Sequence, residues 1–292
     1  GSPASAKGVL GVAAVGPDDS KAWYSTYGEG VDLAAPGGDT RKAGGGVIQD
    51  TVDGKGGHTY AAFQGTSMAT PHVAGAAAVL LGMGLDAEST KDILLNTSQD
   101  KGESGWDEVY GHGRLDVGAA VRRVLVRKNG LQFGIGAAMA LAMAMLANLR
   151  LRYTLPLVGA AAFTAGGLFF LPMLPLPPNA LVDVLSRDLL SMPAAVMDAD
   201  WIHFPLWASA LVPALLVFVF GPSKRLGPIA AGVAVGFGAS LLYGAAAGTL
   251  DLWWLGMGLD KAWLSINGTV CLLAAMATVG VLKLNHQVPD EA

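Results

Sequence analysis

The feature that most constrains the fold is a series of long apolar stretches after residue 128. The 292 residues are 52% hydrophobic and 14% charged, and residues 1–128 hold most of the charge. Five later stretches are long and apolar enough to cross a bilayer as helices: 131–149, 154–171, 204–220, 228–248 and 264–284. The second is interrupted by Gly166-Gly167 and the third is short, so four spans is the alternative. The sequence therefore predicts a separate domain over residues 1–126, followed in the chain by an all-α transmembrane helical bundle over residues 127–292.

Basic residues in the short loops predict the orientation of these spans. Arg150 and Arg152 lie between the first two spans, Lys224 and Arg225 between the third and fourth, and Lys283 at the end of the last. The positive-inside rule places these residues in the cytoplasm, although a basic cluster at 122–128 opposes this orientation. The N-terminal domain is then expected on the outer or periplasmic side of the plasma (inner) membrane and the C-terminus in the cytoplasm. Tryptophans would form an aromatic belt at the outer interface: Trp201, Trp207, Trp253, Trp254 and Trp263.

Small residues recur every fourth position along the fourth predicted span: Gly232, Gly236, Ser240, Gly244 and Gly248. Such a stripe lets another helix approach closely. Packing within the bundle is the preferred interpretation, and helix association with another chain is the alternative. No acidic or basic residue lies deep within a span, which disfavours a coupled transporter.

The segment between the second and third spans predicts a short helix that lies along the membrane surface. Its apolar residues share one face, and Asp183 and Arg187 are placed to form an i,i+4 pair on the other.

The N-terminal domain begins with two short apolar runs, residues 9–15 and 31–35, each closed by Pro and Gly. Neither run alternates, so a parallel sheet covered on both faces is expected. Residues 39–58 are rich in Gly and polar side chains and predict a long surface loop. A helix is expected from the acidic start at Asp86 to Asn96, and another over residues 116–126.

The charge balance and the cysteine content disfavour a nucleic-acid partner and exclude an intrachain disulfide. Residues 1–128 carry 12 Lys/Arg and 15 Asp/Glu, so a nucleic-acid partner is not expected. The single cysteine, Cys271, cannot form an intrachain disulfide. Neither a metal site nor a cofactor is predicted.

The sequence GTSMATPHVAG at residues 65–75 places Ser67 at the first turn of an apolar, Ala-rich helix. A helix of this composition is expected to be buried on nearly every side. Its N-terminal N–H groups favour negative charge, which suits a serine nucleophile beside a developing oxyanion. An inert N-capping serine is the alternative.

This run resembles the serine motif of the subtilisin-like serine peptidases (subtilases, peptidase S8 family), G-T-S-M-A-x-P-x-V-A-G. Residues 24–28, 35–37 and 111–116 resemble further subtilase segments in the same order, with Thr26 where the family more often has Asn. The resemblance covers residues 1–126 and corresponds to the C-terminal part of a subtilase catalytic domain. It implies a partial subtilisin-like parallel sheet with helices, an α/β fold, and Ser67 as the catalytic nucleophile.

The resemblance also implies a catalytic Asp and His in D-[ST]-G and H-G-T motifs before the serine, and neither motif precedes Ser67. The oxyanion Asn is expected just before residue 1. His72 lies about 140° around the helix from Ser67, so a packed structural histidine is preferred. His58 and His112 do not fit the motif, and Asp32 and Asp39 are expected to be solvated loop carboxylates.

Two functions remain open from the sequence. The first is a membrane-anchored serine endopeptidase that hydrolyses a protein or peptide substrate through an acyl-enzyme on Ser67. This piece alone is expected to be inactive because it lacks the base. The second is a non-catalytic, subtilase-like peptide-binding or scaffold domain on a membrane bundle.

Overall fold

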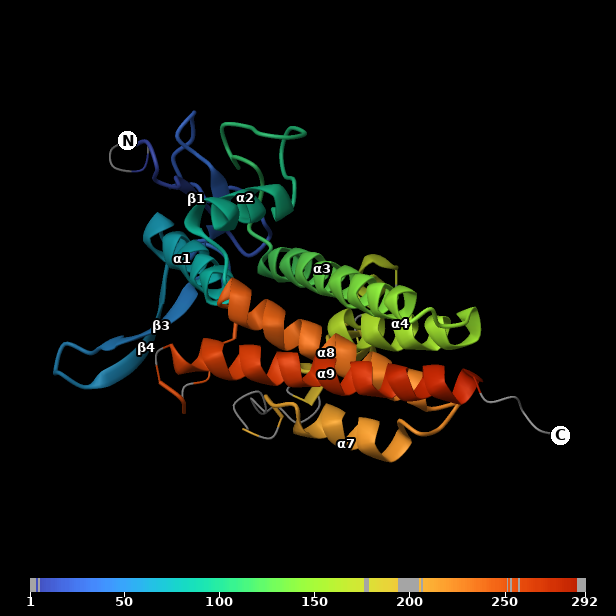
Figure 1. The fold of residues 1–292 in the computed structure, drawn as a ribbon. Helices are drawn as coiled ribbons and strands as arrows, with labels where there is room; N and C mark the ends of the chain where they lie inside the picture. Colours follow the sequence, from blue (N-terminus) through green and yellow to red (C-terminus); the bar gives the residue numbers. More distant parts are fainter. Residues whose placement is uncertain are drawn as a thin grey trace. The chain divides into compact units, whose positions relative to one another are not determined.

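The computed structural model describes residues 6–175, 179–193, 207–250 and 258–287, together with Ala4, Pro205, Leu252 and residues 254–256, with side chains up to Leu284. The chain divides into two compact units, residues 1–124 and 125–292, which are taken separately below (Figure 1).

The first unit is built on two parallel strands, β1 (Val12–Val15) and β2 (Leu33–Pro36). Their register pairs Val12 with Leu33 and Val15 with Pro36, as the two non-alternating apolar runs predict. Helix α1 (Thr66–Gly82) packs against both strands. The core consists of side chains from these elements and from α2 (Ala87–Thr97), together with Ala22, Leu115, Ala120 and Val124.

Helix α1 buries only one stripe of its surface. Ala69, Val73, Ala76 and Leu80 are buried at helical spacing, whereas much of the opposite face is exposed. The prediction of burial on nearly every side is therefore wrong. Within this unit α1 packs on β1, β2 and α2.

Residues 47–63 form an antiparallel hairpin of β3 (Val47–Val52) and β4 (His58–Phe63). The prediction of a loop over residues 39–58 is wrong for β3. The strand contains Val47, Ile48, Thr51 and Val52, whose β-branched side chains favour extended backbone despite the flanking glycines.

Helix α2 begins as the sequence predicts. The Asp86 carboxylate accepts the amide of Ser89 at 2.8 Å, which satisfies one of the free N–H groups at the helix start.

The second unit is helical. Its longer elements are α3 (Val117–Leu146, which begins in the first unit), α4 (Leu151–Gly166), α7 (Leu211–Phe220), α8 (Gly227–Ala247) and α9 (Leu259–Gln287). Shorter pieces are the 3-10 turn η1 (Leu171–Met173) and α5 (Ala180–Leu185). Helices α8 and α9 pack side by side, and α4 packs against α8 (Figure 1).

Among the described residues, three helices are long and apolar enough to cross a membrane: α3, α8 and α9. Two of the five predicted spans are shorter helices, because α4 has 16 residues and α7 has 10, so the number of spans stays a prediction. At 1.5 Å per residue these helices are about 24 and 15 Å long, shorter than the ~30 Å hydrocarbon core. Phe204, the predicted start of the third span, lies outside the described residues.

Two predicted boundaries move for identifiable reasons. Helix α4 ends at Gly166 because Gly167 adopts φ 59°, where a Cβ would also meet the backbone carbonyl of Arg187. A helix ending at residue 126, followed by a separate span from residue 131, is wrong, because α3 continues through Asn129 and Gly130. The Asn129 side chain donates to the Ser186 carbonyl at 2.8 Å, so the polar interruption is satisfied within the second unit.

Gly232 and Gly236 of α8 pack against α4, whereas Gly244 faces the Leu250 side chain. A Cβ at Gly232 would meet the Leu157 carbonyl, and one at Gly236 would meet the Ala161 carbonyl. Ser240 is buried and donates to the Ala165 carbonyl at 3.5 Å. The predicted pair of Asp183 and Arg187 is confirmed at 2.8 Å.

Three of the five belt tryptophans contribute to one cluster near the start of α9. The Trp254 and Trp263 rings meet edge to face, and Trp207 packs in the same cluster. The indole N–H of Trp263 donates to the Ala208 carbonyl at 2.8 Å. Trp201 and Trp253 lie outside the described residues.

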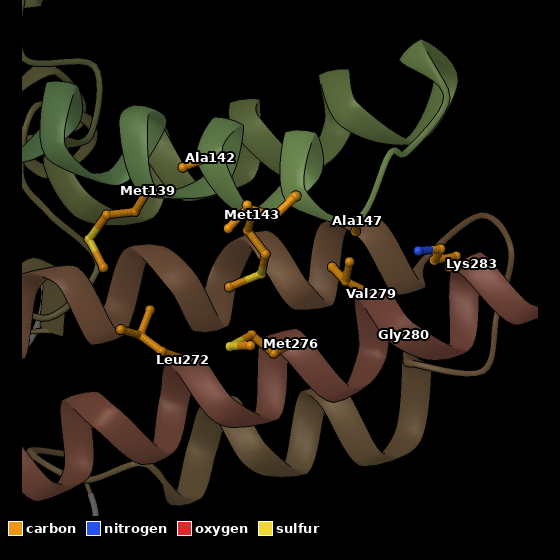
Figure 2. A pocket seen from close by; sticks show the side chains of 10 residues that line it. Met139, Ala142, Met143, Ala147, Leu272, Met276, Val279, Gly280 and Lys283 are labelled. Atoms are coloured by element: carbon orange, nitrogen blue, oxygen red, sulfur yellow. The ribbon is translucent and has the colours of Figure 1, made fainter.

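An apolar groove of about 480 Å³ lies between α3 and α9. Met139 and Met143 line one side and Met276 the other, and Lys283 stands at one end (Figure 2).

Candidate active site

Ser67 is the second residue of α1 and is exposed. Gly65 precedes the helix at φ 155°, and its amide donates to the Gly37 carbonyl at 2.9 Å. Gly37 follows directly after β2. The serine turn is therefore attached to the carboxyl edge of the parallel strands, the edge at which open α/β sheets bind ligands.

Tyr24 holds this junction from the side. Its hydroxyl lies 2.8 Å from the Gly37 carbonyl oxygen and 2.6 Å from that of Gly38. A Cβ at Gly37 would approach the Tyr24 hydroxyl to 2.9 Å and the Gly65 carbonyl to 2.8 Å, so only glycine fits. Burial raises the pKa of Tyr24, which keeps the phenol protonated as a donor.

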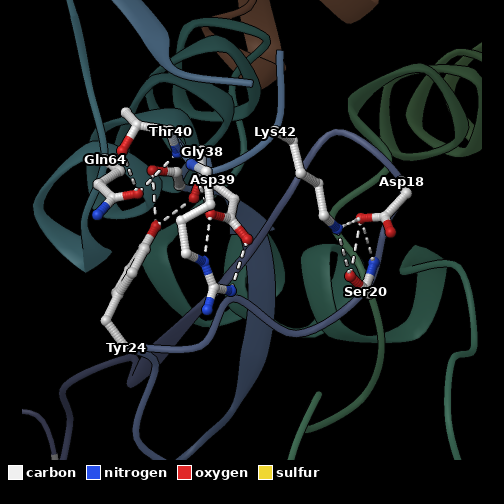
Figure 3. A network of polar contacts seen from close by, with 10 residues as sticks. Asp18, Ser20, Tyr24, Gly38, Asp39, Thr40, Lys42 and Gln64 are labelled. Atoms are coloured by element: carbon white, nitrogen blue, oxygen red, sulfur yellow. Dashed lines mark hydrogen bonds and ion pairs between the residues drawn. The ribbon is translucent and has the colours of Figure 1, made fainter. Parts of the chain in front are cut away.

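A polar network continues from this junction along the following loop (Figure 3). The Gln64 side-chain oxygen accepts the Thr40 amide at 2.7 Å and the Thr40 hydroxyl at 2.8 Å. Arg41 donates to both oxygens of Asp39, at 3.0 and 2.9 Å, and stacks over Trp23 at 5.0 Å. This hydrogen bonding holds the pKa of Asp39 below its usual range.

A second ion pair anchors the same loop to the end of β1. Lys42 lies 2.6 Å from the Asp18 carboxylate, and its hydrogen bond lowers the pKa of Asp18 (Figure 3). Ser20 adds a second hydrogen bond to the same carboxylate oxygen. Together the two pairs order the backbone between β2 and the hairpin.

The Ser67 hydroxyl is not a helix cap. The N-cap position is Gly65, with no side-chain capping bond, so the inert-cap alternative is wrong. Within the described part of the chain, no side chain hydrogen bonds to this hydroxyl. It lies at the positive end of α1, where negative charge is stabilised. Its role as nucleophile stays a prediction.

None of the three histidines of the first unit is hydrogen bonded to Ser67. His72 is exposed, and its Nδ1 lies 2.8 Å from the Met68 carbonyl oxygen one turn earlier. The prediction of a packed histidine is therefore wrong. His58 is exposed at the start of β4, with Nδ1 3.8 Å from Asp50, and His112 is exposed in a loop.

Asp32 and Asp39 are not the solvated loop carboxylates that the sequence predicts. Asp39 is 2% exposed and paired with Arg41. Asp32 is half-buried, and its carboxylate accepts the Gly11 amide at 2.7 Å. Both carboxylates hold backbone in place.

The Gly-His-Gly turn at residues 111–113 adds a segment beside β2. Gly113 has φ 120°, and its carbonyl accepts the Ala34 amide at 2.9 Å. Asp116 then opens α3 by accepting the Ala119 amide at 2.8 Å. The helix start agrees with the predicted position.

Sequence reasoning missed Tyr24 and Gln64 as supports of the serine turn. Their partners lie 13 to 24 residues away in the chain, so no local pattern marks them. Among the described residues, no group of three or more His, Cys, Asp or Glu side chains is placed to hold a metal ion.

The serine turn of the first unit resembles that of the subtilases, and the comparisons of its sequence with known proteins agree. Residues 1–113 match the subtilase family of peptidases, and residues 119–285 match a domain of unknown function, DUF5942. The chain therefore belongs to the DUF5942 family through its longer C-terminal part, and carries a subtilase-family domain before it.

Curated relatives of the first part are serine proteases. Thermitase of Thermoactinomyces vulgaris is 38% identical over 120 residues, which cover 41% of this chain and 38% of thermitase. Subtilisin Savinase of Lederbergia lenta is 35% identical over 122 residues, 41% of this chain and 40% of that protein. A solved protease from Pseudoalteromonas arctica is 34% identical with a TM-score of 0.38, over 42% of this chain and 38% of that one. The chain thus spans about two fifths of the length of these relatives.

Proposed function

We propose that this chain is part of a membrane-anchored, subtilisin-like serine endopeptidase in which Ser67 is the nucleophile. The observation that carries the proposal is the exposed Ser67, at the N-terminus of α1 within a complete subtilase serine motif. The family match of residues 1–113 supports the reaction class.

In the proposed reaction, Ser67 Oγ attacks the carbonyl carbon of a peptide bond while a histidine removes the hydroxyl proton. The tetrahedral oxyanion forms beside the N-terminal N–H groups of α1, including that of Ser67. The carbon–nitrogen bond then breaks, the amine leaves with the proton, and water hydrolyses the acyl-enzyme.

The proposal requires three groups beyond these 292 residues: the histidine base, its orienting aspartate and the oxyanion asparagine. A serine hydroxyl without a base is a poor nucleophile at neutral pH. The 292-residue chain alone is therefore expected to be inactive, and catalysis is assigned to a product that supplies those groups.

Membrane anchoring is supported by α3, α8 and α9, which have the length and composition of spans. The proposed orientation has the peptidase domain on the outer or periplasmic face and the C-terminus in the cytoplasm, because the positive-inside rule assigns Arg150, Arg152, Lys224, Arg225 and Lys283 to the cytoplasmic side. A substrate that is itself secreted or held in the membrane would suit this geometry.

A fluorophosphonate probe tests the nucleophile, because it labels only activated serines. In a product of the complete reading frame, we expect the probe to label the parent protein and not the Ser67→Ala variant. The same substitution should lower peptide hydrolysis by about a thousandfold or more. Ser20→Ala, an exposed serine of the same unit, should label normally. Equal labelling of Ser67→Ala and the parent protein would overturn the assignment.

The same experiment tests the alternative of a non-catalytic peptide-binding or scaffold domain. If the complete product contains no D-[ST]-G and H-G-T motifs and takes no label, the scaffold is the better description. Labelling of the 292-residue chain by itself would contradict the requirement for an added base.

A further inference from the structure

The second unit contains a basic cavity that the peptidase proposal does not use. It has a volume of about 380 Å³ and lies between the start of α4 and the connection from α7 to α8. Arg152, Tyr153 and Pro156 line it from α4, and Lys224, Arg225 and Pro228 from the other side. Three cationic side chains therefore line one cavity, although Arg152 and Lys224 lie 72 positions apart in the sequence.

The backbone adds to this positive potential. Helix α4 begins at Leu151 and α8 at Gly227, so the N-terminal turns of two helices adjoin the cavity. Both turns carry N–H groups without an intrahelical acceptor and the positive end of a helix dipole.

The arginines of this cavity are available to an anion. Arg152 and Arg225 are exposed, and no carboxylate of the described residues pairs with either. Arg152 stacks over the Tyr153 ring at 4.8 Å, and both residues line the cavity. A planar guanidinium can donate two parallel hydrogen bonds to two oxygens of one phosphate group.

An apolar groove begins next to the basic cavity. It has a volume of about 210 Å³ and lies between α7 and α8, lined by Leu216, Phe220, Leu226, Ile229, Ala230 and Val233. Arg225 lines the cavity and Leu226 lines the groove, so the two sites meet within one residue, about 3.8 Å along the backbone. From Leu226 to Val233 the groove follows α8 for about 10 Å.

We propose that these two sites together bind one anionic phospholipid, with the phosphate headgroup in the basic cavity and an acyl chain in the apolar groove. A free phosphate would use the cavity and leave the groove unfilled, whereas a phospholipid matches both. The proposal rests on the membrane placement of the second unit and not on the chemistry of Ser67. By the charge of its loops the site belongs to the cytoplasmic leaflet.

Lipid retention by the purified full chain tests this proposal. The chain in detergent is incubated with phosphatidylglycerol or phosphatidylcholine of the same acyl chains, and bound lipid is counted by native mass spectrometry. We expect phosphatidylglycerol to be retained preferentially. Arg152→Gln with Arg225→Gln should lower its affinity about 25-fold, about fivefold for each cation.

A matched double variant controls for net charge. Arg150→Gln with Lys283→Gln removes one cation beside α4 and one from α9 but none from the cavity, so retention should stay unchanged. Equal loss in both double variants, or equal retention of the two lipids by the parent chain, would overturn the proposal.

Two further arms separate a lipid from a soluble phosphate. Val233→Phe fills the apolar groove and leaves the cations in place, so it should weaken phosphatidylglycerol and not inorganic phosphate. Inorganic phosphate in excess should displace little lipid. Complete displacement, together with undiminished lipid binding by Val233→Phe, would assign the cavity to free phosphate and exclude the lipid.

Discussion

The Tyr24 hydroxyl and the Gly65 amide share one acceptor, the carbonyl oxygen of Gly37, at 2.8 and 2.9 Å. One side chain from the segment after β1 therefore supports the turn that presents Ser67. Tyr24→Phe should destabilise the first unit by about 1 kcal/mol and speed amide exchange at Gly65, because the Gly37 carbonyl loses a half-buried hydrogen-bond donor. Thermal unfolding and hydrogen exchange of the full chain measure both effects.

The control for this prediction is the other tyrosine of the same loop. Tyr27 is 69% exposed and its ring stacks with Lys21, so Tyr27→Phe keeps that contact and should change neither quantity. Equal exchange at Gly65 in Tyr24→Phe and the parent chain would mean that the tyrosine does not support the turn.

The pairing of Asp39 with Arg41 predicts a pH dependence. Because the pKa of folded Asp39 lies below its usual value, the pair stabilises the protein above about pH 4, the unfolded value. That contribution is lost as the pH falls through the lower folded pKa. Asp39→Asn should therefore be less stable than the parent at pH 7, and the two should converge in acid.

Unfolding midpoints between neutral and acidic pH measure this convergence. Arg41→Gln should show the same behaviour, since it removes the other half of the pair. A difference that stays constant over the whole range would show that the carboxylate acts through packing and not through its charge.

The sequence was sufficient for elements whose signals are local. Two non-alternating runs closed by Pro and Gly predict the parallel pair of β1 and β2, and Asp86 three residues before Ser89 predicts the start of α2. The serine turn follows from a motif of eleven consecutive residues. Each of these signals lies within one element, so no tertiary contact is needed to read it.

Elements decided by distant contacts were misjudged. Asn129 and Gly130 suggest a break in α3, but Asn129 donates to Ser186, and Gly130 lies under the Phe169 ring, where a Cβ would come within 3.1 Å. The Asn129 amide therefore has a hydrogen-bond partner, and the absence of a side chain at Gly130 makes room for the Phe169 ring. Neither partner is visible in the local pattern.

The close approach of α8 to α4 predicts a sharp difference between two glycines. A Cβ at Gly236 would meet the backbone carbonyl of Ala161 and come within 2.7 Å of Thr164, so Gly236→Ala must separate the helices. We expect a loss of about 1 to 3 kcal/mol in unfolding free energy, typical of overpacking. Thermal or detergent-induced unfolding measures it.

Gly159→Ala in α4 is the matched control. No atom lies within 4 Å of a Cβ at this position, and alanine favours helix, so stability should be equal or slightly higher. If the two substitutions had the same effect, the glycines of α8 would matter for backbone conformation and not for helix contact.

The charge pattern of the second unit predicts which ends of its helices share a side of the membrane. Arg152, at the start of α4, and Arg225, in the connection from α7 to α8, are residues that the positive-inside rule assigns to the cytoplasm, and they line the same cavity. Trp207, Trp254 and Trp263 gather in one cluster near the start of α9, the end of that helix away from Lys283. In the proposed orientation, the cations would mark the cytoplasmic end and the indoles the outer end.

Single cysteines in a Cys271→Ser background test this orientation with an impermeant maleimide on intact cells. Lys261→Cys, near the start of α9, should label from outside, whereas Ser223→Cys, between α7 and α8, should label only after lysis. The expectation follows from the cost of moving the cations of a short loop across a bilayer. Labelling of residue 223 on intact cells would invert the topology and place the serine turn in the cytoplasm, where the proposed processing of outer or membrane-held substrates could not occur.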